Sequence, residues 1–240
     1  MIDLFARVKK HLLIIIYLLL SLVLLVGCSK TLISAPNSLS NANTIVFKSF
    51  PAISKWMLQA NGTNIANFLD QKYNGKLLQE PINVIIIDAY AVSLNDADTR
   101  LQDSFAKAGY KIRLVHSNGY KASIAGITFN QQPKIGAYSN NYWFLQNNHG
   151  RVFGPYFYKG KYFFIAAFSS ERLSFRFPGI PYHQYVSFKM ARSDLAAQCI
   201  NKAGYTQVLC VNMHNKIPDS DTKLTTGDHD GFAIVLLEPQ

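Results

Sequence analysis

The chain has 240 residues, and its 24 Lys and Arg residues against 14 Asp and Glu residues give a net charge of +10 at neutral pH. This basic balance attracts nucleic acid as well as anionic lipids and polymers, but the export signal described next argues against nucleic acid as a partner. The sequence has three cysteines and no Cys-x-x-Cys pair, so it gives no support for a redox-active or zinc-binding site.

The N-terminal segment has the pattern of a secretory signal peptide, which we predict to span residues 1–27. Arg7, Lys9 and Lys10 precede an apolar run at residues 12–26, and a basic region before a short apolar region is typical of such signals. The run has 15 residues, whereas a membrane-spanning helix needs about 20. An uncleaved signal anchor is the alternative.

The segment ends in a motif that resembles the lipobox of bacterial lipoproteins, Leu25-Val26-Gly27-Cys28. In that family the cysteine is acylated and the signal is cut before it, so the resemblance implies a palmitate-type lipid anchor at Cys28. Two or three acyl chains hold a protein firmly, because each buried methylene contributes about 0.8 kcal/mol. By resemblance to enteric lipoproteins, Ser29 implies sorting to the outer membrane, with the domain facing the periplasm or the cell surface.

Residues 28–43 are rich in Ser, Asn and Pro and predict a flexible tether, and residues 44–240 suit a single domain. Removal of the signal leaves 21 basic and 13 acidic residues, a net charge of +8. This charge favours contact with lipid headgroups, lipopolysaccharide phosphates or cell-wall polymers. Solubility alone is the alternative explanation.

The hydrophobic pattern of residues 44–240 predicts an α+β domain with a mixed or antiparallel sheet. Runs of β-branched residues indicate buried strands, and apolar residues at helical spacing that end at a glycine indicate helices. Dense aromatic runs at residues 138–185 are interpreted as core packing, with stacking on sugars or a lipid groove as the alternative. In chain order, the predicted elements are a short helix at 65–76, a buried strand at 82–87, a helix at 94–108, a strand at 111–115, a hairpin of 151–158 with 161–168, a helix at 187–203, and strands at 206–212 and 232–237.

One tetrapeptide occurs twice, as Lys107-Ala108-Gly109-Tyr110 and as Lys202-Ala203-Gly204-Tyr205. Both copies stand where a predicted helix passes into a predicted strand, which indicates two pseudo-repeated helix–strand units. The alternative explanation is that many helices end in a similar sequence with a glycine, whether or not they are related by duplication. Cys199 and Cys210 lie in the second unit, and either a disulfide or two buried thiols fit them, since a disulfide needs Cα atoms within about 7 Å.

Short motifs follow one another in a set order along the domain, namely Pro81-Ile82-Asn83-Val84, Ala108-Gly109-Tyr110, His149-x-Arg151, Ser170-Glu171-Arg172, His183, Arg192 and Asp230-Gly231. In this order they resemble the LssY C-terminal domain family over nearly the whole domain. The family has Trp where Tyr110 stands, a fuller His-His run near His149, and Asp at position 171. It has no established biochemical activity, and its members occur fused to phosphatase-like membrane domains or near secretion loci. The resemblance therefore implies an envelope protein linked to transport or lipid metabolism.

Five polar residues are candidates for one binding site: His149, Arg151, Glu171, His183 and Arg192. Two imidazoles and two guanidiniums around a carboxylate could clamp a phosphate or a carboxylate, because the arginine fork binds such groups in a bidentate way. The alternative is a buried polar network that only orders the junction of sheet and helix, since buried charges are paired whether or not they bind a ligand.

Four acidic residues are weaker candidates for a hard-metal site, Asp219, Asp221, Asp228 and Asp230. Their spacing does not match an EF-hand loop, and such residues usually form turns, so we predict no metal and no cofactor. The sequence also lacks a Gly-x-Ser-x-Gly elbow and a fitting Ser-x-x-Lys arrangement. We therefore predict a non-enzymatic envelope component that binds a protein or an anionic ligand and is linked to secretion or transport. The alternative is a hydrolase of phosphorylated or lipid substrates that uses the two histidines and the arginines named above.

Overall fold

The computed structural model describes residues 43–114 and 119–240. The predicted signal peptide, the predicted acylation site Cys28 and nearly all of the predicted tether lie outside these residues. Within the part of the chain that is described, no helix has both the length and the apolar character needed to cross a membrane.

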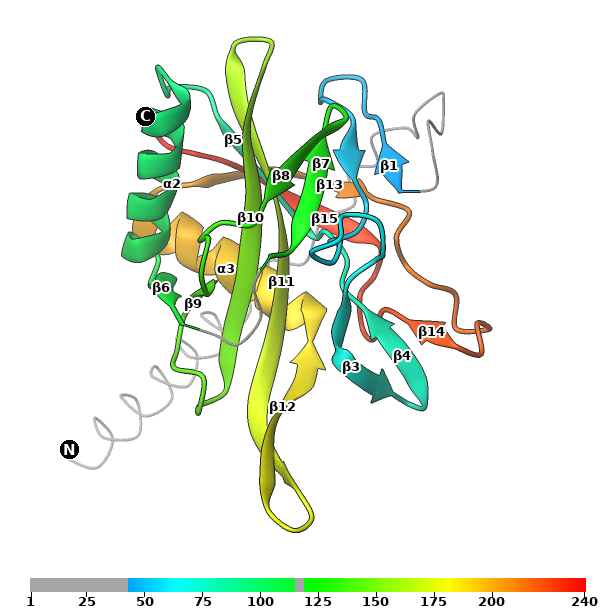
Figure 1. The fold of residues 1–240 in the computed structure, drawn as a ribbon. Coiled ribbons are helices and arrows are strands. Elements are labelled where there is room, and N and C mark those ends of the chain that lie inside the picture. Colours follow the sequence, from blue (N-terminus) through cyan, green and yellow to red (C-terminus); the bar gives the residue numbers. More distant parts are fainter. Residues whose placement is uncertain (1–42, 115–118) are drawn as a thin grey trace, which may run out of the picture.

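An eight-stranded sheet forms the centre of the domain (Figure 1). Neighbouring strands are antiparallel except for one parallel pair, so the fold is α+β with a mixed, mainly antiparallel sheet, as predicted. From one edge to the other, the strands are β13 (Thr206–Asn212), β15 (Phe232–Leu237), β5 (Val84–Asp88), β11 (Lys161–Arg176), β10 (Asn147–Tyr158), β9 (Ala137–Ser139) and β6 (Lys111–Arg113), with β12 (Ile180–Ser187) paired to β11.

Two helices, α2 (Leu94–Lys107) and α3 (Phe188–Ala203), pack against each other and cover one face of this sheet (Figure 1). Capping serines fix where the helices begin. Ser93 and Ser187 each accept a hydrogen bond from the backbone N–H three residues further on, at 3.1 and 2.8 Å, and this satisfies a donor of the first turn. The local sequence signals therefore set the helix bounds.

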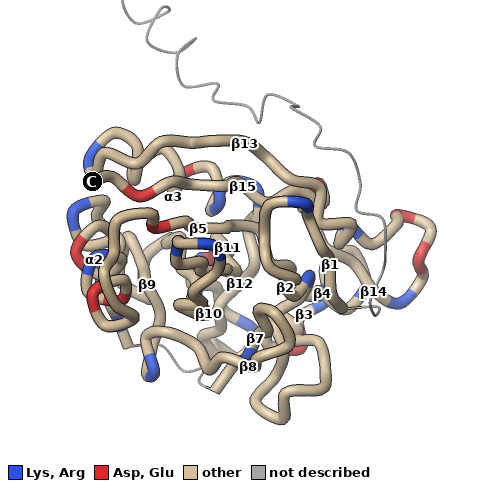
Figure 2. The backbone as a smooth tube through the Cα atoms, turned by 90° about the horizontal axis from the view of Figure 1, so that it is seen from above, with Lys and Arg blue, Asp and Glu red and all other residues tan. Residues whose placement is uncertain are grey.

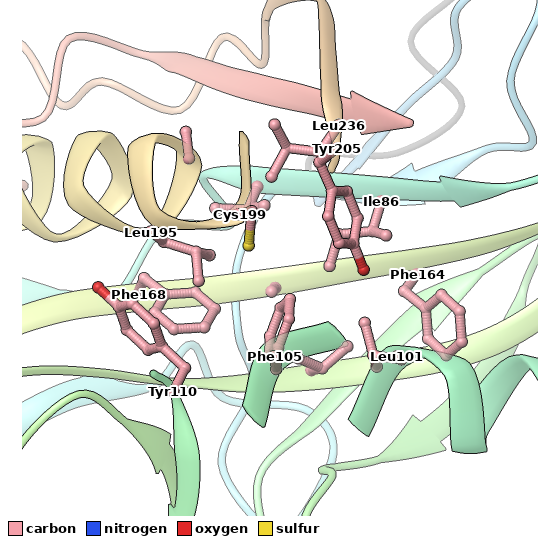
Figure 3. Close-up of a cluster of buried hydrophobic side chains, with 14 of the residues drawn as sticks. Ile86, Leu101, Phe105, Tyr110, Phe164, Phe168, Leu195, Cys199, Tyr205 and Leu236 are labelled. Carbon is pink, nitrogen blue, oxygen red and sulfur yellow. The ribbon is translucent and has the colours of Figure 1, made fainter. Parts of the chain in front are cut away.

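Both faces of the central strands are buried, and their side chains alternate between two cores. In β5, Val84 and Ile86 face the helices, whereas Ile85 and Ile87 face away from them. A strand covered on both sides is a continuous apolar run rather than an alternating one, which explains the β-branched sequence. Figure 3 shows the core on the helix side, where side chains of both helices meet those of the sheet. Cys199 is a free, buried thiol in this core, so no Cys199–Cys210 disulfide is formed.

Two smaller sheets complete the described domain. Side chains of the first one pack on the face of the central sheet that points away from the helices. Its strands are β1 (Thr44–Ile45), β2 (Ile53–Ser54), β7 (Lys121–Ile124) and β8 (Ile127–Asn130), and those of the second are β14 (Leu224–Thr225), β4 (Lys76–Gln79) and β3 (Asn67–Tyr73).

The predicted helix at residues 65–76 is wrong, because this segment forms the β3–β4 hairpin. Asn74 and Gly75 make its two-residue turn with φ angles of 52° and 80°. The Asn-Gly pair is typical of such turns, since both positions require a left-handed backbone conformation. This signal outweighs the weak helical spacing of the apolar residues around it.

The structure does not confirm the proposed pseudo-duplication. Gly109 and Gly204 both follow a helix and both have positive φ angles, 91° and 78°, and the tyrosine after each glycine is buried. However, the strands that follow, β6 and β13, lie at opposite ends of the strand order. The shared tetrapeptide is accounted for by the requirements of a helix exit.

Candidate functional site

The β10–β11 hairpin presents polar residues on the face of the sheet that points away from the helices. His149 and Arg151 are two residues apart on β10 and point to the same face as Phe153. Gly150, between them, faces the helices, where an added Cβ would lie 2.5 Å from Cγ of Phe168. Glycine at this position lets the Phe168 ring pack directly against β10, with His149 and Arg151 on the opposite side.

Glu171 of β11 lies at the centre of the polar groups. Its Oε1 atom is 2.8 Å from Nδ1 of His183 in β12 and 3.7 Å from Nδ1 of His149. The side-chain amide of Asn147 also donates a hydrogen bond to it, at 3.4 Å. Burial alone would raise the pKa of Glu171, but the two imidazoles and the amide outweigh it and lower this pKa to about 2. Glu171 is therefore ionised at neutral pH.

The two histidines differ in their protonation. The interaction with Glu171 raises the pKa of His183, against the opposing effect of partial burial. Burial lowers the pKa of His149 to about 4; Glu171 opposes this shift, and Arg151 and His183 add to it. At neutral pH His149 is therefore neutral, whereas the surroundings of His183 favour its charged form.

Glu80, directly after β4, faces the same space and is not predicted by any sequence motif. Its side chain is 5% exposed, and its carboxyl makes no hydrogen bond to another described residue. Burial raises the pKa of Glu80 to about 7, although Arg151 lowers it, and Glu171 raises it further. The only sequence signal at this position is an acidic residue that stands between two strand-forming segments.

These groups line a cavity of about 280 Å³. Its remaining walls are mostly apolar and aromatic. The ring of Tyr120 lies 4.7 Å from Cζ of Arg151, and the ring of Trp143 lies 5.9 Å from that of His183. A few charged groups that face apolar walls are typical of sites for small amphipathic molecules. The lining residues are Phe68, Leu69, Glu80, Leu114, Tyr120, Trp143, His149, Arg151, Glu171 and His183.

Arg192 does not reach the cavity, so four of the five residues in the predicted cluster come together. Arg192 lies in α3, on the face of the sheet opposite the cavity. It donates hydrogen bonds to both carboxylate oxygens of Asp230, at 2.8 and 2.9 Å, and to the backbone carbonyl of Phe232. It therefore ties the helix to the start of β15.

The four acidic residues considered for a metal make contacts within the protein. Asp228 accepts a hydrogen bond from a tyrosine hydroxyl at 2.5 Å and another from a backbone N–H at the start of α3 at 2.8 Å. Asp230 forms an ion pair with Arg192. Asp221 accepts two backbone N–H groups of its own turn, and Asp219 is exposed. Residues 43–114 and 119–240 contain no group of three or more His, Cys, Asp or Glu residues placed to hold a metal ion.

The chain was compared with family models, with curated proteins and with solved structures, and none of them matches it. The resemblance to the LssY C-terminal domain family therefore stays a prediction.

Proposed function

We propose that the chain is a membrane-anchored binding protein and that its cavity holds a small amphipathic ligand with an anionic head group. The observation that carries this proposal is a cavity lined by Arg151 and by His183, whose charged form Glu171 favours, together with apolar side chains. Glu171 balances one of these charges, and one positive charge remains as long as Glu80 is protonated. A phosphate or carboxylate would compensate it through charge-assisted hydrogen bonds.

The size of the cavity fits this class of ligand. About 280 Å³ lies at the lower end of small-molecule sites. It suits a head group with the first carbons of a chain. Leu69 and Leu114 line the cavity and are 48% and 77% exposed, so a longer chain could leave the cavity over apolar side chains.

The protonation states of the two histidines favour binding over acid–base chemistry, whereas Glu80, with a pKa of about 7, is suited to exchange a proton near neutral pH. A general base has to accept a proton near the operating pH. The charged form of His183 is favoured by Glu171, and His149, with a pKa of about 4, is a weak base. Charged His183 can instead donate a hydrogen bond to an anion.

We also propose that acylation at Cys28 anchors the domain in the bacterial envelope, at the outer membrane, as the lipobox and Ser29 indicate. An amphipathic ligand suits an envelope protein linked to transport or lipid metabolism, which the LssY resemblance implies. Metabolic labelling with a palmitate analogue tests the anchor. Label is expected on the wild type, and loss of the label in Cys28→Ala is expected as well; an unlabelled wild type would contradict the anchor.

Calorimetric titration with octyl phosphate, and with octanol as the neutral counterpart, tests the ligand class. Arg151→Gln should weaken octyl phosphate binding about 10- to 100-fold, the value of a charge-assisted hydrogen bond. Arg172→Gln is the matched control, because Arg172 lies on the neighbouring strand β11, is exposed and bonds only to Gln184 among the described residues. Equal affinity for octyl phosphate and octanol, or equal losses in the two variants, would contradict the proposal.

Hydrolysis of phosphorylated or lipid substrates is the second candidate, and the 2.8 Å contact between Glu171 and His183 favours it. A carboxylate that orients an imidazole is the arrangement that activates water or a hydroxyl group. Turnover of nitrophenyl phosphate and nitrophenyl ester substrates, abolished in His183→Gln, would establish it. Absence of turnover together with tight octyl phosphate binding would exclude this reaction for these substrates.

A further inference from the structure

Exposed aromatic and aliphatic side chains gather near the cavity, in two segments that we call the aromatic end. The first segment is the loop Tyr142–Leu145 between β9 and β10. The second is residues 175–180, which comprise the end of β11, the turn and the first residue of β12. Their large apolar side chains are open to solvent: Phe177 is 100% exposed, Phe175 63% and Trp143 45%. Within the first segment the ring of Phe144 contacts those of Tyr142 and Trp143. Several large apolar side chains exposed in neighbouring positions are typical of an interaction site.

The second segment is the tip of a two-stranded ribbon that extends beyond the rest of the sheet (Figure 1). From Leu173 to Arg176, β11 pairs only with β12. A two-stranded ribbon in water is marginally stable by itself. A partner that buries the tip would therefore stabilise it.

The charged residues within the segments of this region are basic, although Asp194 of α3 accepts a hydrogen bond from the side chain of Asn140 at 3.1 Å. The segments 111–114, 140–146 and 172–183 contain Lys111, Arg113, Arg172 and Arg176 and no acidic residue. Cζ of Arg113 lies 4.2 Å from the centre of the Tyr142 ring, and Cζ of Arg176 lies 4.5 Å from that of Tyr182, so cations and rings are interleaved. Acidic residues gather elsewhere, notably along α2 and beside β14 (Figure 2).

We propose that the aromatic end docks on a bilayer surface rich in anionic lipid. Aromatic rings, tryptophan and tyrosine above all, prefer the interface between headgroups and acyl chains, and Lys and Arg side chains are attracted to anionic headgroups. Trp143 belongs both to this surface and to the cavity wall. Docking therefore brings the mouth of the cavity to the bilayer, where an amphipathic ligand can pass between the two.

Tryptophan fluorescence can test the docking, independently of any N-terminal anchor. The chain has two tryptophans, and Trp56 is buried. In Trp56→Phe, Trp143 is the only reporter. The full chain is reconstituted on vesicles of equal parts phosphatidylglycerol and acyl-brominated phosphatidylcholine. We expect bromine to quench Trp143 and the vesicles to shield it from acrylamide in the water, and we expect both effects to decrease on vesicles without phosphatidylglycerol.

The matched control places tryptophan at the opposite end of the long β10–β11 hairpin. Phe157 is 55% exposed there, so Phe157→Trp in a background without the two native tryptophans should remain accessible to acrylamide and unquenched by bromine. If Trp56→Phe does not fold, the difference between wild type and Trp143→Phe gives the same signal. The proposal would be overturned if Trp143 on vesicles that contain phosphatidylglycerol stayed accessible to acrylamide and was not quenched by bromine. Equal quenching of a tryptophan at position 157 would overturn it as well. Either result would leave the cavity ligand proposed above unaffected.

Discussion

Replacement of Glu80 by glutamine should stabilise the domain at pH 8 and have little effect at pH 4. Burial raises the pKa of Glu80 from 4.5 to about 7. Between these two values the unfolded chain ionises Glu80 while the folded domain keeps the proton, so the free energy of unfolding falls as the pH rises. A shift of this size corresponds to about 3 kcal/mol above pH 7, and glutamine, which does not ionise, removes this cost. We expect a gain of about 2–3 kcal/mol.

Urea unfolding of wild type and Glu80→Gln at several pH values from 4 to 8 measures this difference. The gain should be near zero at pH 4, grow between pH 5 and pH 7, and then level off. Asp103→Asn is a suitable control, because Asp103 is an acidic residue on the exposed side of α2 and its replacement should not reproduce the curve. A gain that does not vary with pH, or a loss at pH 8, would refute the burial of an ionisable carboxyl at this place.

Three further substitutions test other parts of the structure. His149→Gln should reduce the loss of stability between pH 7 and pH 4 by up to about 3 kcal/mol, because only the unfolded chain protonates His149 in that range. If the free energy of unfolding of wild type and variant, measured in urea, fell equally between pH 7 and pH 4, a buried neutral imidazole would be contradicted. Arg192→Met should cost roughly 3 kcal/mol in the same assay, since it leaves Asp230, which is one third exposed, without its partner. Gly150→Ala should cost about 1–3 kcal/mol, because its Cβ would overlap the Phe168 ring; unchanged thermal unfolding would show that the ring can move.

The elements that could be predicted are those with local signals. Helix α2 has a capping serine before it and a glycine after it, and β15 is a continuous apolar run, so neighbouring residues are enough to place both. The β3–β4 hairpin also has a local signal, the Asn74-Gly75 turn, but the apolar spacing around it resembles that of a helix. Strand order and the two-sided burial of the sheet depend on contacts between distant segments, which spacing along the chain does not encode.

The candidate site divides in the same way. His149 and Arg151 are two residues apart on one strand, so their common direction follows from the sequence. Glu80 joins them only because the β3–β4 hairpin packs beside β12, and nothing near Glu80 in the sequence indicates this. Trp143 stands in a run of four hydrophobic residues with asparagines on both sides, Asn140-Asn141 and Asn147-Asn148. That pattern is typical of an exposed loop, and core packing was the wrong interpretation for this part of the aromatic segment.

The alternative that the polar residues form only a structural network can be weighed against their hydrogen bonds. A network kept for folding has its buried groups satisfied, because an unsatisfied buried group costs about 1–3 kcal/mol. Here Nδ1 of His149 is buried without a hydrogen-bond partner, and the Glu80 carboxyl has none among the described residues. Both groups line the same cavity. Buried atoms without a hydrogen-bond partner also occur elsewhere in the described domain, for example Oη of Tyr138 and Nδ1 of His229. Those of His149 and Glu80 differ because they line a cavity, where a ligand can supply the missing hydrogen bonds.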